Sequence, residues 1–168
     1  MSYEQQINVW FEQFDHRMHV DIPNIIAETA TEFFQDRFKT QEWDKIPWQP
    51  LQPKYAAKKG RGRGRILTAS GRLQRSIRPS IVKPNQVRIS AGNSRVPYAK
   101  IHNEGLRVKG LVKVKAHPTR NFMGKGKTVQ IKAHSRNVDF TMPQRQFMGH
   151  SKYLNAVLID KLTKHFNS

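Results

Sequence analysis

The segment Pro97-Tyr98-Ala99-Lys100-Ile101-His102-Asn103-Glu104-Gly105 lies near the middle of the chain, between a proline and a glycine that mark its two ends. Proline is favoured at the first position of a helix and glycine just past its end. Tyr98 and Ile101 supply a small apolar face, so the segment predicts a helix of one or two turns. The simplest alternative is a capped helical turn that only links two strands.

Glu104 in this segment is the only carboxylate between Asp44 and Asp139. Because lysines and arginines dominate this part of the chain, the Glu104 carboxylate is expected to be ionised and paired. The sequence leaves open whether Glu104 pairs with His102 or whether the two side chains only pack.

Two amphipathic helices are predicted before this segment. Apolar residues at spacings of three and four form a stripe on a helix over residues 3–18: Ile7, Trp10, Phe11, Phe14 and Met18. Asp21 is expected to cap a second helix, with Pro23 just inside it. Both apolar faces carry too many aromatic rings to remain in water, so they are expected to cover a sheet or to contact another subunit.

A proline-rich connection and a glycine-arginine loop follow these helices. Three prolines exclude a continuous helix over residues 43–53. Three apolar side chains are expected to hold the connection on the core: Trp43, Trp48 and Leu51. The loop over residues 54–66 alternates glycine with arginine, which predicts a flexible basic loop that contacts phosphate, or else a solvated loop tip.

The next two segments predict a short helix and a hairpin. Residues 66–77 suit a short helix capped by Thr68 or Ser70. Its inward-facing side chains are expected to be Leu67, Leu73 and Ile77. Residues 80–83 and 86–91 alternate apolar and polar side chains on either side of Pro84-Asn85, which predicts a β-hairpin.

A second, basic hairpin is predicted after the central segment. Residues 108–117 and 128–134 place valine, leucine and isoleucine among lysines, and a glycine-containing loop separates them. We predict that these two runs pair as one long antiparallel hairpin arm within residues 106–136. Both runs end in Lys-Ala-His, at residues 115–117 and 132–134, which reflects either chance or a paired strand end.

The C-terminal part predicts an extended segment and a last helix. Residues 142–149 form the extended segment, and Ser151 is expected to cap the helix. The apolar stripe of this helix is expected to contain Leu154, Val157 or Leu158, Leu162 and Phe166. The order of elements predicts an α+β fold, in which N-terminal amphipathic helices and a C-terminal helix pack on an antiparallel β-sheet with a long basic β-hairpin.

Composition indicates one domain that depends on partners. The 168 residues suit a single domain over residues 1–168, and the 37% hydrophobic content suggests that part of the chain is solvated or buried only against partners. The absence of cysteine excludes disulfides and thiolate metal sites. No signal peptide and no apolar run of spanning length is recognisable, so a soluble cytoplasmic protein is expected.

Charge is distributed unevenly along the chain. The protein carries 30 lysines and arginines against 12 acids, for a net charge of +18. Residues 1–44, the predicted acidic helical part, hold nine acids and three bases, whereas residues 45–168 hold three acids and 27 bases. This asymmetry favours either a polyanionic partner or head-to-tail contacts between copies, while the remaining alternative is a solvated basic face.

The sequence offers little for catalysis. The candidate metal ligands lack the spacing that prebuilds a site on a helix: His102, His117, His134, His150 and Asp139. Phosphate-binding glycine motifs and nucleophile motifs are absent, and acids are scarce after residue 44. We therefore expect no enzyme activity, no metal and no cofactor; a nuclease or peptidase would have to depend on Glu104 or His102.

Three segments in this order resemble the virion morphogenesis family of tailed phages, the Mu-like tail-completion proteins. The first runs from Trp48 through Ile66-Leu67-Thr68-Ala69-Ser70-Gly71-Arg72-Leu73 to Ile77, the second is the central segment, and the third is Pro143-Gln144-Arg145-Gln146-Phe147-Met148-Gly149. By this resemblance the family-motif residues are Leu67, Gly71, Leu73, Ile77, Tyr98, Ala99, His102, Gly105, Arg145 and Phe147. The chain departs from the family at Gln146, where proline is usual, and in the length of its basic hairpin.

The resemblance implies a non-enzymatic assembly protein of phages and prophages. Such a protein completes the tail and forms the tail end that joins the head, as a ring of identical subunits that is expected to be a hexamer. The implied partners are other copies of the chain, the tail tube and head-connector proteins, with no membrane. The implied location is the virion, and the host cytoplasm during assembly.

Cations in the loop and in the arm are the candidate contacts with DNA or with partner proteins. They are Lys58, Lys59, Arg61, Arg63, Arg65, Lys109, Lys113, Lys115, Lys125 and Lys127. Contacts of such side chains with phosphate are independent of base sequence. The alternative function is therefore a sequence-independent nucleic-acid-binding protein with a basic arm.

Overall fold

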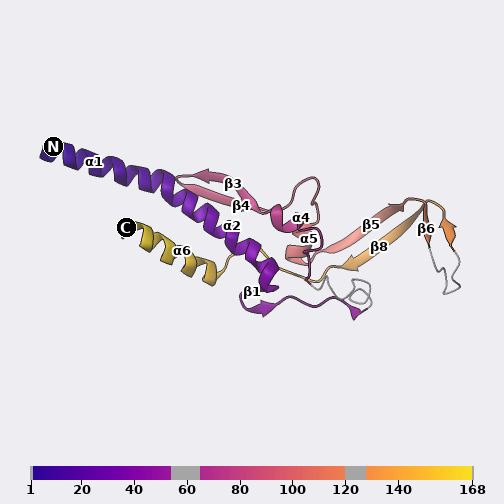
Figure 1. The fold of residues 1–168 in the computed structure, drawn as a ribbon. Helices are drawn as coiled ribbons and strands as arrows, with labels where there is room; N and C mark the ends of the chain where they lie inside the picture. The colour runs from indigo at the N-terminus through magenta and orange to yellow at the C-terminus, as the bar shows by residue number, and fades with distance from the viewer. Residues whose placement is uncertain (1, 54–64, 120–127, 168) are drawn as a thin grey trace.

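The computed structural model describes residues 2–53, 65–119 and 128–167 and shows an elongated α+β protein (Figure 1). A long helix consists of α1 (Tyr3–His16), a π-helical turn (Arg17–Asp21) and α2 (Ile22–Thr40). The middle of the chain contains β1 (Glu42–Trp43), β2 (Ile46–Pro47), α4 (Arg72–Arg75), β3 (Arg78–Lys83), β4 (Gln86–Ser90) and α5 (Ala99–Glu104). The last elements are β5 (Arg107–Val114), β6 (His117–Thr119), β7 (Val129–Ile131), β8 (His134–Thr141) and α6 (Lys152–Phe166).

The predicted α+β class is confirmed, with helices at both ends of the chain and antiparallel strands between them. In the described residues the strands pair as two-stranded ribbons and do not join in one sheet: β1 with β2, β3 with β4, β5 with β8, and β6 with β7. Helix α2 covers β3 and β4, whereas β5 and β8 form an arm that reaches away from the helices (Figure 1).

The two predicted N-terminal helices are one continuous helix, and the expected cap at Asp21 is wrong. Asp21 has helical dihedral angles and makes no side-chain capping bond. Pro23 explains the irregularity, because proline lacks an N–H and crowds the carbonyl one turn earlier. The helix widens into a π turn, in which the Ile22 N–H donates to the Arg17 carbonyl, and it does not break. A capping box of Ser2 and Gln5 starts α1.

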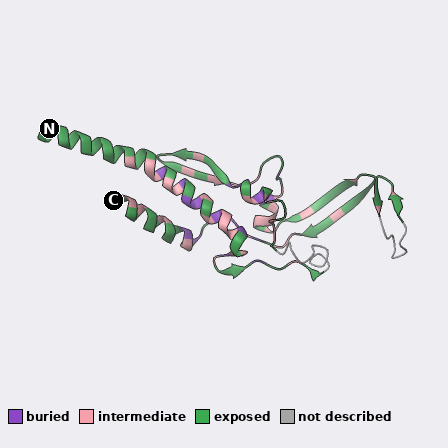
Figure 2. Cartoon of the chain, in the orientation of Figure 1, coloured by how far each residue is buried: buried purple, intermediate pink, exposed green. Residues whose placement is uncertain are grey.

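Burial divides the long helix into two halves (Figure 2). Helix α1 has no buried residue, whereas α2 buries a face that includes Ala27, Ala30, Phe34 and Phe38. Helix α6 runs antiparallel to the long helix, because Lys161 Nζ lies 3.5 Å from Glu32 Oε2 and His165 Nε2 lies 3.4 Å from Asp21 Oδ2. The N-terminal α1 thus extends past the core, and its apolar stripe is exposed except where Trp10 and Phe14 line a hollow with Phe166 of α6.

Ser151 caps α6 as predicted, since its hydroxyl accepts hydrogen bonds from the Tyr153 and Leu154 N–H groups. The same hydroxyl donates to Asp44 Oδ1 in the turn between β1 and β2. Leu154 is buried, and Leu158, not the exposed Val157, packs against the core.

Phe38, at the end of α2, lies at the centre of the core. Its ring centroid lies 5.2 Å from that of Phe147 and 5.5 Å from that of Trp48. Trp43 and Trp48 are buried as predicted, and Leu51 is half-buried. The connection after α2 is therefore fixed on the core by its aromatic rings.

The predicted helix over residues 66–77 is a single turn, α4. Its N-cap is Gly71 at φ 63°, one residue after the predicted Ser70, and the Ser70 hydroxyl accepts a long hydrogen bond of 3.5 Å from the Arg72 N–H at the start of the helix. Leu67 also has a positive φ, of 61°, so the chain turns twice before the helix begins. Leu73 and Ile77 are buried as predicted, Leu67 packs partly buried against the core, and the predicted hairpin is β3–β4.

The central segment forms α5 as predicted, and Gly105 ends it in the left-handed conformation at φ 68°. Glu104 faces Lys100, with 4.0 Å between Oε2 and Nζ. The His102 ring packs edge-on against Tyr98, with 5.8 Å between centroids. His102 and Glu104 therefore have different neighbours and do not pair.

Helix α5 is docked on the extended segment over residues 142–149. The Asn103 amide oxygen accepts hydrogen bonds from the N–H groups of Phe147 and Met148, both at 3.0 Å, and the amide nitrogen donates to the Met148 carbonyl. A Cβ on Gly105 would lie 3.0 Å or less from atoms of Gln144, which include its backbone. The end of α5 and this segment therefore fit as one unit.

The pairing of the arm differs from the prediction. Strand β5 pairs with β8, which continues to Thr141, and residues of the two predicted runs pair with each other only in β6 and β7 and at Val114 with His134. The predicted arm, 106–136, is therefore too short by five residues. A run of polar residues over 134–137 hid the start of β8, because alternation of apolar side chains appears only from Val138 onward.

The repeated Lys-Ala-His steps lie opposite each other in the arm. Val114 pairs with His134 and His117 pairs with Ile131, so the Lys-Ala steps at 115–116 and 132–133 interrupt both strands at the same level. In each step the histidine Nδ1 lies 3.0 Å from the lysine carbonyl. The recurrence thus marks a paired break in the ladder.

Replacing Asn103 should destabilise the protein strongly. Asn103→Ala leaves two N–H groups of the partly buried 147–148 segment without acceptors, so the free energy of unfolding should fall by about 2–4 kcal/mol in urea titration. Asn155→Ala, on the exposed face of α6, is the control and should change it by less than about 0.5 kcal/mol. Equal effects of the two variants would contradict the role of Asn103.

Candidate functional site

The ten family-motif residues lie mainly in and around the core. Four are among its most buried side chains, Leu73, Ile77, Ala99 and Phe147. Leu67 and Tyr98 pack against this core, and the two glycines occupy left-handed turns. These positions indicate that the motif residues stabilise the fold. Two of them, His102 and Arg145, have ionisable side chains.

His102 is a partly buried imidazole on α5. Its Nδ1 atom is buried and has no hydrogen-bond partner among the described residues. Burial lowers the pKa of His102 below its ordinary value, and the positive charge of Arg145 lowers it further. The lowered pKa favours the neutral imidazole at pH 7.

Arg145 is a buried cation that joins three segments. Only 4% of its surface is exposed. Its N–H donates to the His102 carbonyl at 2.8 Å, and its guanidinium donates to the carbonyls of Gln49, at 3.1 Å, and Pro50, at 3.5 Å. No carboxylate in the described residues pairs with it, and burial lowers its pKa. Burial of this guanidinium without an opposite charge lowers the free energy of unfolding.

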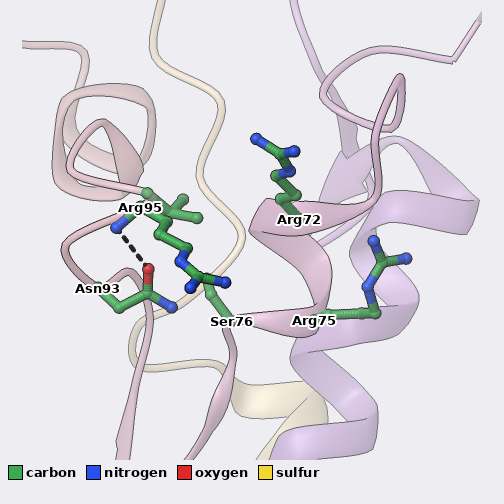
Figure 3. Close-up of a pocket in the computed structure, with 6 residues that line it drawn as sticks. Arg72, Arg75, Ser76, Asn93 and Arg95 are labelled. Atoms are coloured by element: carbon green, nitrogen blue, oxygen red, sulfur yellow. Dashed lines mark hydrogen bonds between the residues drawn. The ribbon is translucent and has the colours of Figure 1, made fainter.

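Three arginines line a hollow of about 380 Å³, and their guanidinium groups point in different directions (Figure 3). Arg72 and Arg75 come from α4, Arg95 comes from the loop before α5, and Ser76, Asn93 and Val96 complete the lining. The Asn93 side chain accepts a hydrogen bond from the Arg95 N–H at 2.9 Å, and Arg75 Nη2 donates to the Ser70 carbonyl at 2.7 Å. We call this group the arginine cluster.

The arginine cluster can bind anions. In the described part of the chain, no ion pair neutralises any of its three guanidinium groups. All three side chains are exposed, so they can contact a phosphate without a large desolvation cost. Arginine binds phosphate oxygens with two parallel hydrogen bonds, which favours a phosphate-bearing partner.

The predicted contact residues are only partly described. Lys109, Lys113 and Lys115 lie exposed along β5 and the break after it, and Arg65 is exposed before Ile66. Six others lie outside the described residues: Lys58, Lys59, Arg61, Arg63, Lys125 and Lys127. The structure therefore shows the arm cations on a ribbon and gives no placement for the glycine-arginine loop over residues 54–64.

Sequence reasoning missed the arginine cluster and Asn103. Arg72 and Arg75 are three apart, a spacing that places two side chains on one face of a helix, and this signal was available. Arg95 is 20 residues further along the chain, and only the fold brings it to the hollow. Asn103 stands inside the central segment, but a partner more than 40 residues away gave no local signal.

The described residues hold no group of three or more metal-ligating side chains. Nor does any helix among them have the length and apolar character needed to cross a bilayer.

Comparison with known proteins identifies a family. A model of the phage virion morphogenesis family matches residues 5–167 of the 168-residue chain. No curated protein and no solved structure matches the chain.

Lowering the pH should destabilise the fold through His102. In the unfolded chain His102 takes up a proton as the pH falls through its ordinary pKa of 6.5, whereas in the folded chain its pKa is lower. The contribution of the neutral His102 to the free energy of unfolding is therefore fully present above pH 6.5 and is lost as the pH falls below that value. Urea midpoints of the wild type and His102→Gln, measured between pH of about 7.5 and about 5.5, should converge or cross at the acid end.

His150→Gln, at an exposed position, is the matched control and should keep the wild-type pH dependence. If His102→Gln loses stability with acid as steeply as the wild type does, the buried imidazole is not the sensitive group.

Proposed function

Because the chain belongs to the phage virion morphogenesis family, we propose that this structural protein completes the phage tail and forms the tail end that joins the head. The observation that carries the proposal is the extent of the family match, which covers residues 5–167 and thus includes the arm and both terminal helices. Virion morphogenesis is the family's role, and the protein is accordingly a virion-associated one.

The proposed working form is a ring of identical subunits, expected as a hexamer. The protomer is elongated, with an exposed apolar helix at one end and a basic ribbon at the other (Figure 1). Unlike surfaces at opposite ends favour head-to-tail contacts, which close into a ring when the rotation between neighbours allows it. In this ring the acidic part of one subunit, residues 1–44, faces the basic part of the next.

Phage DNA is the proposed polyanion inside the ring. The excess of 24 positive charges over residues 45–168 gives any channel lined by this part a strong attraction for phosphate. The arginine cluster and the arm lysines are the proposed contacts, which would be independent of base sequence. The tail tube and the head connector are the proposed protein partners.

The second candidate function is a free nucleic-acid-binding protein. The unpaired guanidinium groups of the arginine cluster favour it, because they suit a phosphate backbone in either setting. The two functions differ in assembly: a free binder acts as a monomer on duplex, whereas the proposed tail protein binds DNA weakly unless it has assembled.

Purified protein should form closed rings. Light scattering should give a discrete multiple of the 19.5 kDa protomer, and negative-stain images should show annular particles that also cap tail tubes. A strict monomer that never associates with tails or heads would count against the proposal, and tight binding of that monomer to duplex would support the second candidate.

Removing the arginine cluster should weaken contact with DNA. In Arg72→Gln/Arg75→Gln/Arg95→Gln, the slope of log affinity against log salt should fall by about 2–3, since each lost phosphate contact contributes about 0.9. Arg78→Gln/Lys83→Gln/Arg88→Gln, exposed cations of β3 and β4, removes the same charge and should change the slope much less. Equal slopes for the two variants would assign binding to net charge and not to the cluster.

A further inference from the structure

The arm has two chemically different faces. One face of the ribbon is mainly apolar, because every second residue of β5 and its partner in β8 point to the same side. The pairs on this face are Val108 with Phe140, Gly110 with Val138, Val112 with Arg136, and Val114 with His134. The opposite face is mainly polar, and on it Arg107 binds Asp139 with two hydrogen bonds of 2.7 and 2.8 Å. We call the first of these the apolar arm face.

In the described chain only the connection over residues 49–52 approaches the apolar arm face, at Phe140, and the other side chains of this face are half-buried or exposed. The arm reaches away from the helices, and its residues are mostly exposed (Figure 2). An isolated two-stranded ribbon is only marginally stable in water and needs packing on one face. Gly110 lies in the middle of this face, and a Cβ built there meets no atom within 4 Å. The face therefore has a notch at its centre, and glycine in a strand often marks a close approach of another chain.

A hollow continues this face at the base of the arm. It measures about 480 Å³, and Phe140, Met142, Pro143 and residues 49–52 line it. Arg145 also lines the hollow, as a buried guanidinium without a carboxylate partner in the described residues. The surface thus combines apolar side chains with a cation that lacks a counter-ion.

Helix α1 has the complementary surface. Its stripe is exposed, with 59% of Phe11 in solvent, and the rings of Trp10 and Phe14 stack at 5.4 Å between centroids. Glu4 and Asp15 lie in line with Phe11 at helical spacing, so carboxylates border one edge of the stripe. A row of exposed aromatic side chains of this size is unusual on a surface that stays free.

We propose that α1 of one copy lies on the apolar arm face of the next copy, with its aromatic stripe over Gly110 and toward the hollow at Arg145. The inference rests on the proposed ring and identifies the surfaces through which neighbouring subunits would touch. The occupant is a second copy because the two surfaces lie at opposite ends of the protomer and cannot meet within one chain (Figure 1).

Charge supports the same pairing. Residues 2–21 carry four acids and one arginine, whereas the described arm carries six lysines and arginines and one acid. Arg136 lies on the apolar arm face itself, opposite Val112. Apolar contact between the stripe and the face would supply the affinity, and the opposite charges would select the direction of the contact.

Cysteine cross-linking tests the contact directly, because the natural chain has no cysteine. Phe11→Cys and Gly110→Cys proteins, mixed in equal amounts and mildly oxidised, should form a disulfide-linked pair of the two variants. The double variant should form a ladder of linked protomers that ends at the size of the closed ring. Matched controls are Val9→Cys, about 200° around the helix from Phe11, and Leu111→Cys, on the opposite arm face; neither should cross-link with the other member of the pair.

Three outcomes would overturn the inference. The first is cross-linking of Phe11→Cys mainly with itself, which would pair α1 with α1, and the second is equal cross-linking of the controls. The third is the absence of a cross-link in protein that light scattering shows to be a ring. In the last case the proposed ring stands and only its contact is wrong. A monomer by light scattering with no cross-link would remove both.

Filling the notch gives an independent readout. Gly110→Trp should leave circular dichroism of the protomer unchanged, because the position is open within the chain, and should abolish assembly. Leu111→Trp, whose position is 64% exposed on the opposite face, should assemble like the wild type. Assembly of Gly110→Trp at wild-type concentration would overturn the proposal.

Discussion

The docking of α5 on the extended segment over residues 142–149 holds this protein together. One asparagine side chain, Asn103, hydrogen-bonds with the backbone of that segment as a neighbouring strand would, and Trp48 donates to the Gln146 carbonyl from the other side at 2.7 Å. The segment thereby places Phe147 against Phe38 in the core. Because α5, the connection after α2 and the lead into α6 all meet here, each depends on the same few hydrogen bonds.

Local sequence patterns were sufficient to predict the helices and their ends. The Pro97 to Gly105 segment gave α5 and its end, the spacing of apolar residues gave the helical stripes, and Ser151 gave the cap of α6. These features depend on neighbours within one or two turns, which a single sequence displays. Periodicity also predicted the buried face of α2, but the same periodicity in α1 forms a stripe with no buried residue.

Features that depend on long-range packing were not predictable. Pro23 usually marks a helix start, and only the packing of α2 against the core and α6 makes a π turn preferable to a break. The pairing of β5 with β8 joins residues that lie between 20 (Val114 and His134) and 34 (Arg107 and Thr141) positions apart, and polar side chains at the start of β8 hid the strand. The arginine cluster likewise exists only once the loop that carries Arg95 lies beside α4.

The paired Lys-Ala steps at 115–116 and 132–133 have a mechanical consequence. Ladder pairing is absent from both strands at one level, so the outer ribbon of β6 and β7 can pivot there without the loss of any inter-strand bond. The inner ribbon keeps its register through such a rotation. The arm therefore consists of two ribbons joined by backbone without ladder bonds, so a bend at this level costs no strand pairing.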